Sequence, residues 1–210
     1  MKRVLVVDNY DSFVYNLVQI LREDPLCSFE VVTNDRIPFS RLDEFDCLLL
    51  SPGPGIPEEA GDLLALIDRC HRSHAILGVC LGHQAIGQYF GAQLRQMSSP
   101  KHGHPSTLQI RDHQDRLYKQ VNEPIQVGRY HSWLLSPTSF PDCLHITATD
   151  EEGHIMSFSH KQYPIYGVQF HPESIMTPQG SMMIRNFLHE KRIVFDSNEK
   201  QKGNSFTIAG

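Results

Sequence analysis

Apolar residues follow two different periods along the first half of the chain. Short, nearly unbroken apolar runs, typical of buried strands, alternate with segments whose apolar residues recur roughly every three to four positions, as in amphipathic helices. The pattern predicts strands at residues 4–7, 29–33, 47–50 and 75–79, and helices at residues 13–21, 63–70 and 83–90. Asp11 or Ser12 is the expected N-cap of the first helix. This alternation predicts an α/β fold with a mainly parallel central sheet flanked by helices.

The second half of the chain has a different pattern, with short β-rich runs separated by turns. Strands are expected at residues 108–110, 125–129, 144–149, 155–159 and 165–170, and a last helix at residues 179–191. Some of these strands should pair antiparallel as a small added element, while residues 165–170 enter the main sheet. We predict a single domain over residues 1–195, followed by a polar and mobile tail at residues 196–210.

Composition narrows the classes of protein that the chain can represent. A length of 210 residues fits one α/β domain with a sizeable core. The net charge of −5 gives no reason to expect a nucleic acid or an anionic membrane as partner. No apolar run approaches the roughly 20 residues that span a bilayer, and the first residues lack a signal-peptide core. The five scattered cysteines form no C-x-x-C pair, so we expect reduced thiols and a cytoplasmic location.

One cysteine has a local setting that suits a nucleophile. Cys80 follows a predicted strand and precedes a predicted helix, in the segment Gly78-Val79-Cys80-Leu81-Gly82. This is the cysteine counterpart of the G-x-S-x-G turn, in which small neighbours let a tight turn expose the nucleophile. The start of the following helix favours a thiolate and a developing oxyanion. The alternative is that Cys80 is a small core residue, as most cysteines after an apolar run are.

A base and a carboxylate follow about ninety residues later, in Phe170-His171-Pro172-Glu173. In extended backbone, residues two apart point to the same side. His171 can therefore face Cys80 while Glu173 holds the other ring nitrogen. Nucleophile, base and orienting carboxylate together predict a catalytic triad.

The loop Ser51-Pro52-Gly53-Pro54-Gly55-Ile56-Pro57 follows the predicted strand at residues 47–50. Parallel sheets bind ligands at this edge, and the glycines can expose N–H groups to an oxyanion. The loop can also be a rigid turn without chemistry. It lacks the P-loop pattern, which argues against nucleotide binding. Neither His71 with His74 nor His102 with His104 has a convincing set of further ligands, so no metal site is expected.

The chain resembles the class I glutamine amidotransferases. Within that family, it resembles more specifically the glutaminase subunits of anthranilate synthase and of para-aminobenzoate (aminodeoxychorismate) synthase. The resemblance covers roughly residues 3–190. The segments that carry it are DNYDSF at residues 8–13, the loop at residues 51–57, GVCLGHQAI at 78–86, RYHS at 129–132 and QFHPES at 169–174.

The resemblance implies a role for each matching residue. Cys80 is then the nucleophile, His171 the general base and acid, and Glu173 the carboxylate behind it. Gly55 and Leu81 supply oxyanion N–H groups, and the glutamine-binding residues are Gly53, Pro54, Gly55, Gln84, Ser132 and Trp133. The implied reaction hydrolyses L-glutamine without a cofactor or metal. It passes ammonia to a chorismate-binding large subunit in a hetero-oligomer.

Two positions depart from the family pattern. His104 stands where many relatives carry lysine, and Trp133 stands where leucine is common. The change at His104 is expected to affect a loop that faces the partner subunit. Trp133 is expected only to reshape a wall of the pocket. Two other functions remain open on the sequence: a stand-alone γ-glutamyl cysteine hydrolase, and a catalytically silent regulatory subunit.

Overall fold

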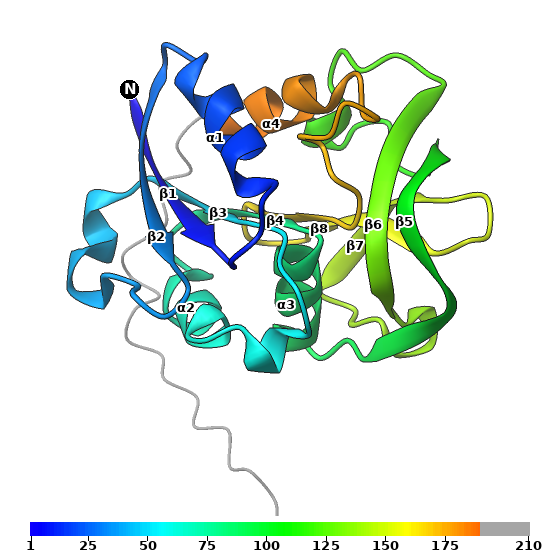
Figure 1. Ribbon diagram of the computed structural model, residues 1–210, viewed down its shortest axis with the longest axis horizontal. Helices are drawn as coiled ribbons and strands as arrows, with labels where there is room; N and C mark the ends of the chain where they lie inside the picture. Colours follow the sequence, from blue (N-terminus) through cyan, green and yellow to red (C-terminus); the bar gives the residue numbers. More distant parts are fainter. Residues whose placement is uncertain (190–210) are drawn as a thin grey trace, which may run out of the picture.

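The computed structural model describes residues 1–189, and these form one nine-stranded mixed sheet with helices on both faces (Figure 1). The strand order is β2-β1-β3-β4-β9-β8-β7-β5-β6. The expected tail at residues 196–210 lies outside the described residues.

The first five strands of this order are parallel. They are β2 (Cys27–Thr33), β1 (Lys2–Asp8), β3 (Cys47–Leu50), β4 (Ala75–Val79) and β9 (Ile165–Val168). β3, β4 and β9 are neighbours, so the loops that follow them leave from the same edge of the sheet. In parallel α/β sheets this carboxyl edge is where ligands bind.

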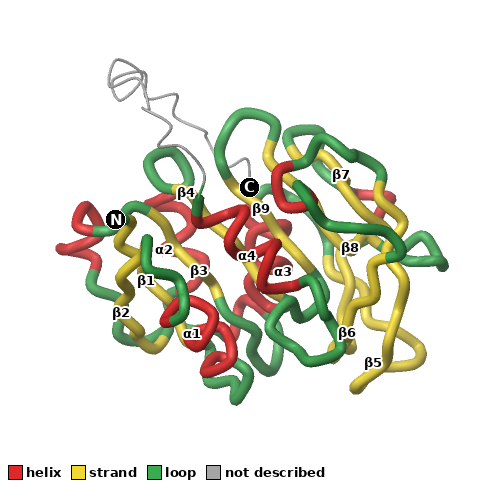
Figure 2. Tube along the Cα trace, turned by 90° about the horizontal axis from the view of Figure 1, so that it is seen from above, coloured by secondary structure: helices red, strands yellow, loops and turns green. Residues whose placement is uncertain are grey.

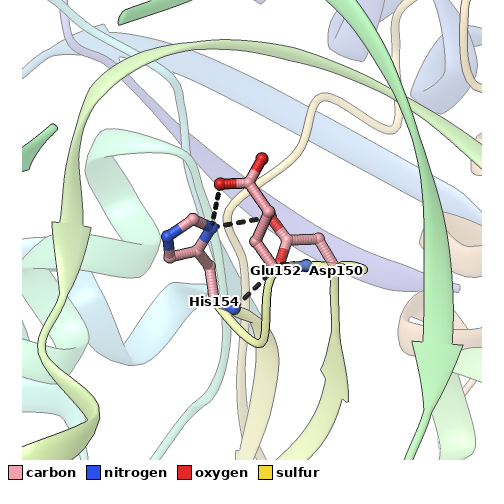
Figure 3. Close-up of side chains that lie close together, drawn as sticks. All are labelled: Asp150, Glu152 and His154. Atoms are coloured by element: carbon pink, nitrogen blue, oxygen red, sulfur yellow. Dashed lines mark hydrogen bonds and ion pairs between the residues drawn. The ribbon is translucent and has the colours of Figure 1, made fainter. Parts of the chain in front are cut away.

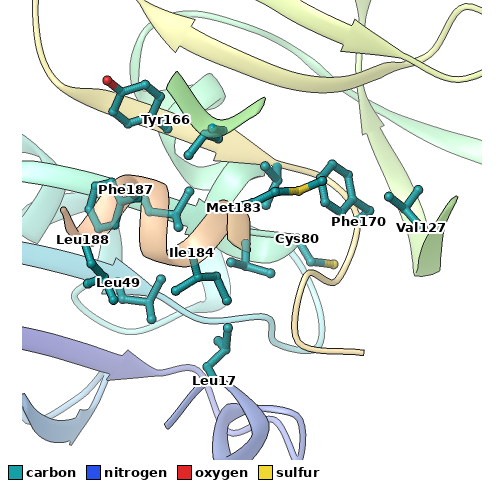
Figure 4. Close-up of a cluster of buried hydrophobic side chains, with 14 of the residues drawn as sticks. Leu17, Leu49, Cys80, Val127, Tyr166, Phe170, Met183, Ile184, Phe187 and Leu188 are labelled. Carbon is teal, nitrogen blue, oxygen red and sulfur yellow. The ribbon is translucent and has the colours of Figure 1, made fainter. Parts of the chain in front are cut away.

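Four helices bury the two faces of the parallel strands. α1 (Val14–Arg22) and α4 (Gly180–Leu188) cover one face, while α2 (Leu63–Cys70) and α3 (Leu81–Tyr89) cover the other (Figure 1). Alternate residues of β1 enter the two cores: Val4 and Val6 pack with α1 and α4, and Leu5 and Val7 with α2 and α3. Figure 4 shows the first core, which includes Cys80. Each fully buried aliphatic side chain contributes about 1.5–3 kcal/mol.

The other four strands are antiparallel and extend the sheet at one end of the molecule. They are β5 (Leu94–Ile110), β6 (Ile125–Leu135), β7 (Leu144–Thr149) and β8 (Ile155–His160). Figure 2 shows β5 and β6 at the opposite end from β1 and β2. The sheet curls, so Gly128 of β6 forms an isolated bridge with His171. Short 3₁₀ helices lie at Phe39–Glu44, Pro57–Glu59, Arg116–Tyr118 and Pro137–Ser139.

The predicted fold class is confirmed, and the boundaries of several predicted elements are reproduced. β3, β4, β7 and α2 have the expected bounds. The last helix is shorter than expected within the described residues, since α4 ends at Leu188. No helix in residues 1–189 has the length and apolar character needed to cross a membrane.

The largest error concerns β5, of which the pattern predicted only residues 108–110. Its residues 94–107 are mostly polar or exposed and include two prolines and a glycine. This part is nevertheless a strand because it pairs with β6, with register shifts between Gln96 and Lys101 and between His102 and His104. Pairing with β6 therefore makes this segment a strand although its local hydrophobic pattern does not favour one. β6 is likewise longer than expected and carries Ser132 and Trp133.

The expected N-cap of the first helix is also wrong. Phe13 is the residue at the cap position, and it makes no side-chain cap hydrogen bond. The Asp11 carboxylate instead accepts the N–H of Phe13 at 2.8 Å, in a turn that precedes the helix. The competing local hydrogen bond of the aspartate explains the difference.

Two glycines allow β4 and α3 to approach each other and β3. A Cβ on Gly78 would lie 2.4 Å from the carbonyl carbon of Gly82, and one on Gly82 would lie 2.5 Å from the carbonyl oxygen of Leu50. Real Cβ contacts are not this short, so both positions require glycine.

We predict that Gly82→Ala destabilises the fold by about 1–3 kcal/mol, because the added methyl overpacks this contact. The sign of the stability change is decisive, because replacing glycine by alanine at an open helix position would stabilise the fold by about 1 kcal/mol. Urea unfolding measures the change. A Gly82→Ala protein as stable as the parent would contradict the close approach.

Candidate active site

Three of the predicted site segments meet at the carboxyl edge of neighbouring parallel strands. The loop at residues 51–57 follows β3, Cys80 follows β4, and His171 lies three residues beyond the end of β9. Segments as far apart in sequence as Ser51 and His171, a separation of 120 residues, are thereby brought together.

Cys80 occupies a backbone conformation that residues other than glycine rarely adopt. Its φ is 51° and its ψ is −99°, and it forms the N-cap position of α3. Its own N–H donates to the Val168 carbonyl of β9 at 2.8 Å. Leu81 begins α3, where first-turn N–H groups have no partner within the helix. The Leu81 N–H is therefore a better oxyanion donor than that of Cys80.

His171 and Glu173 are paired as the sequence predicted, but not for the predicted reason. His171 Nδ1 lies 2.7 Å from Glu173 Oε1, and both side chains are buried. The backbone is not extended, because β9 ends at Val168 and residues 172–173 lie in a turn closed by the Ser174 N–H on the His171 carbonyl. The expectation of an extended segment is wrong; a tight turn brings the carboxylate back to the ring.

Two aromatic rings fix the orientation of the imidazole. Phe13 and Tyr130 lie with their ring centroids 5.1 Å and 4.9 Å from that of His171, at steep angles. The N–H of His171 donates to the Gly128 carbonyl at 3.0 Å, which ties the base to β6. Neither aromatic residue was singled out from the sequence, although both lie in segments that carry the resemblance.

The electrostatics of the pair favour a protonated ring. Burial acts to lower the pKa of His171, but hydrogen bonding and charge from Cys80 and Glu173 outweigh it and raise the pKa to about 10. Within residues 1–189, His171 Nε2 has no partner that meets the distance and angle criteria of a hydrogen bond. The Cys80 sulfur nevertheless lies close enough to raise the pKa of the ring. The arrangement suits a thiolate–imidazolium pair.

The glycine-rich loop is anchored to the start of the chain. Ser51 Oγ accepts the N–H of Asn9 at 2.9 Å, and Asn9 Nδ2 donates to the Ser51 carbonyl at 2.8 Å. Gly53 packs so closely on Asn9 and Leu81 that a Cβ would clash with both. Gly55 has a φ of 73°. The loop is thus held beside the N-terminus of α3, with Pro54 and Gly55 exposed.

The remaining predicted residues come from α3 and β6. Gln84 Nε2 donates to the Trp133 carbonyl at 3.0 Å and to Gln169 Oε1 at 3.1 Å. Gln169 Nε2 lies 3.7 Å from Cys80 Sγ. Gln84 and Trp133 therefore meet, and Ser132 is the neighbour of Trp133 on the same strand. Gln169 is a site residue to which the sequence reasoning gave no role, although it begins the segment QFHPES.

A buried ion pair joins Arg129 of β6 to Asp150, the residue that follows β7. Arg129 Nη1 donates to Asp150 Oδ2 at 2.6 Å, and both side chains are almost fully buried. His154 Nδ1 lies 2.8 Å from the same Asp150 oxygen and 3.9 Å from Glu152 Oε2 (Figure 3). Burial acts to raise the pKa of Asp150, but the bonds from His154 and the charge of Arg129 hold it below its usual range. Asp150, Glu152 and His154 have the spacing of metal ligands. Two donors already share one Asp150 oxygen, so we interpret the cluster as the counter-charge of Arg129.

Comparisons with known proteins agree on one family. The family described as "Glutamine amidotransferase class-I" matches residues 5–191. The "Bifunctional protein TrpGD" of Thermotoga maritima is 43% identical over 90% of this chain, which spans only 32% of that longer relative. The "Aminodeoxychorismate/anthranilate synthase component 2" of Bacillus subtilis is 42% identical over 90% of this chain and 97% of its own length. Among solved structures, "a putative gmp synthase subunit a protein" of Thermoplasma acidophilum has a TM-score of 0.79 at 30% identity, covering 90% of this chain and 92% of its own.

We predict that the His171 ring keeps its proton at neutral pH and titrates near pH 10, because Cys80 and Glu173 stabilise the charged form. Proton NMR of the imidazole C–H signals measures this. His131 is an internal control, because burial and then the charge of Arg129 lower its pKa to about 3, so its signal stays constant between about pH 5 and about pH 9. In Cys80→Ala the titration of His171 should shift to lower pH. Titration at or below the usual value of about 6.5 in the parent would contradict the pair.

Proposed function

The chain belongs to the class-I glutamine amidotransferases, and from that premise we propose that Cys80, His171 and Glu173 are the triad with which it hydrolyses glutamine. The observation that carries the assignment is the buried His171 ring. Glu173 holds one of its nitrogens, and the Cys80 sulfur and Glu173 together raise its pKa. These are the parts of an activated thiol nucleophile.

In the first half of the reaction the Cys80 thiolate attacks the side-chain amide carbon of L-glutamine. The negative charge moves to the amide oxygen, which the N–H groups of Leu81 and Gly55 stabilise. The His171 imidazolium then gives its proton to the amide nitrogen. The carbon–nitrogen bond breaks, ammonia leaves, and a γ-glutamyl thioester remains on Cys80.

In the second half His171, now neutral, takes a proton from water. The hydroxide attacks the thioester carbonyl, and the carbon–sulfur bond breaks to release glutamate. The thiolate and the imidazolium are restored. Glu173 keeps the ring in one orientation throughout.

We assign glutamine binding to Gly53, Pro54, Gly55, Gln84, Ser132 and Trp133. Both N–H groups of the Gln84 amide are engaged by Trp133 and Gln169, so Gln84 offers the substrate only its carbonyl oxygen. This oxygen suits the α-ammonium group of glutamine and not its carboxylate. The carboxylate therefore takes its donors from other groups of the site.

The partner is proposed from the relatives. Several that match over most of their length carry names of component 2 of anthranilate or aminodeoxychorismate synthase. On that basis the ammonia is used by a large subunit that aminates chorismate. All five cysteines are free thiols, which fits a reducing, cytoplasmic location.

We predict that Cys80→Ser abolishes glutamine-dependent product formation, while the large subunit bound to the variant still uses free ammonium. A serine hydroxyl at this site is a far weaker nucleophile than the thiolate, whereas amination of chorismate does not involve Cys80. Product formation with glutamine and with ammonium salt, using candidate large subunits of both kinds, measures the two activities.

Loss of both activities in Cys80→Ser would contradict ammonia transfer between subunits. Glutaminase activity of the parent that is high alone and indifferent to either large subunit would favour the stand-alone γ-glutamyl hydrolase.

We predict that His171→Ala lowers kcat for glutamine hydrolysis about a thousandfold or more, as the loss of a triad member does elsewhere. His189→Ala is the matched control, because His189 also pairs with a carboxylate, Asp24 at 2.8 Å, but at the end of α4. Steady-state glutamate release measures both variants. A decrease below about tenfold in His171→Ala, with the control unchanged, would remove His171 from the mechanism.

A further inference from the structure

Gln169 contacts the sulfur of Cys80 from inside the protein. Its side chain is fully buried, and its Nε2 lies 3.7 Å from Cys80 Sγ. Its Oε1 accepts a hydrogen bond from Gln84 Nε2 at 3.1 Å. The amide therefore bridges the nucleophile and α3, and none of the steps derived above uses it.

The orientation of both amides is determined by a backbone carbonyl. The Trp133 carbonyl oxygen can only accept, so the Gln84 group that lies 3.0 Å from it must be the NH₂. The same NH₂ then faces Gln169, which must present its oxygen. The NH₂ of Gln169 is consequently the end that points at Cys80. A flip of either amide would oppose two acceptors or two donors.

The Trp133 carbonyl is itself held by a second donor. His131 Nδ1 lies 3.0 Å from it, and His131 Nε2 accepts from Arg129 Nε at 3.1 Å. This requires a neutral ring with its proton on Nδ1, because Arg129 can only donate. The pKa of His131 is lowered to about 3, first by burial and then by Arg129. Asp150 balances the charge of Arg129. The Trp133 carbonyl, which orients both amides, is thus held by hydrogen bonds from both Gln84 and His131.

We propose that Gln169 is a further catalytic residue, which donates an N–H to the Cys80 thiolate, and that Gln84 and His131 are positioning residues for it. The bond stabilises the charged sulfur and holds it in one rotamer for attack. It is lost when the sulfur becomes a thioester and reforms when the thiolate is released. The inference rests on Cys80 being the nucleophile.

The test uses Gln169→Met, which keeps the length of the side chain and removes the donor. The readout is the rate at which iodoacetamide alkylates Cys80 between about pH 5 and about pH 9, followed by mass spectrometry of the peptide that contains it. We expect the profile to shift to higher pH and the rate at neutral pH to fall about threefold to tenfold, the effect of one lost hydrogen bond to a charged sulfur. kcat should fall with little change in KM, because the bond is to the nucleophile and not to the substrate.

Two further variants sharpen the test. Gln84→Met should shift the profile in the same direction by less, because Gln169 remains but loses its support. Gln109→Met, an exposed residue of β5, should leave both readouts unchanged. If Gln169→Met does not fold, Gln169→Asn replaces it, since the shorter amide cannot reach both partners.

An alkylation profile in folded Gln169→Met that matches the parent would overturn the inference. Alkylation needs no turnover, so this failure is distinct from failure of the proposed function. An inactive Cys80→Ser with an unchanged Gln169→Met profile would reject the role of Gln169 and leave the triad intact. A fully active Cys80→Ser would reject the triad.

Discussion

The site depends on one strained turn, in which Cys80 passes from β4 into α3 with a φ of 51°. Such a conformation costs a residue other than glycine about 1–3 kcal/mol, and it persists only where the surroundings fix it. Here the Cys80 N–H is bound by Val168, and Gly78 and Gly82 let β3, β4 and α3 approach closely enough to hold both ends. The turn presents the sulfur beside the first N–H groups of the helix.

The curl of the sheet supplies the rest of the site. β6 is the last strand of the sheet, yet Gly128 reaches back to His171 through an isolated bridge. The same strand carries Tyr130 against the imidazole and the Trp133 carbonyl to which Gln84 donates. The antiparallel strands are therefore part of the active site, because β6 contacts both the base and the Gln84 amide.

Most of the parallel half of the fold was predictable, because β3, β4, β9 and the centre of β1 are buried on both faces and therefore mainly apolar, as in residues 47–50. β5 was not, because its polar residues are held by pairing with β6 and not by burial. The triad residues could be identified from their motifs, but the turn that pairs His171 with Glu173 could not, since residue spacing alone does not distinguish a turn from a strand. The position of Gln169 depends on contacts between β6, α3 and the end of β9, which no local pattern contains.

The most direct test of the account is to trap the covalent intermediate. The protein is mixed with L-glutamine, quenched with acid during turnover, and digested, and the Cys80 peptide is examined by mass spectrometry. The account predicts a γ-glutamyl adduct on Cys80, at an occupancy that rises when glutamate release is slowed. Turnover without any adduct on Cys80, or with the adduct on another residue, would contradict it.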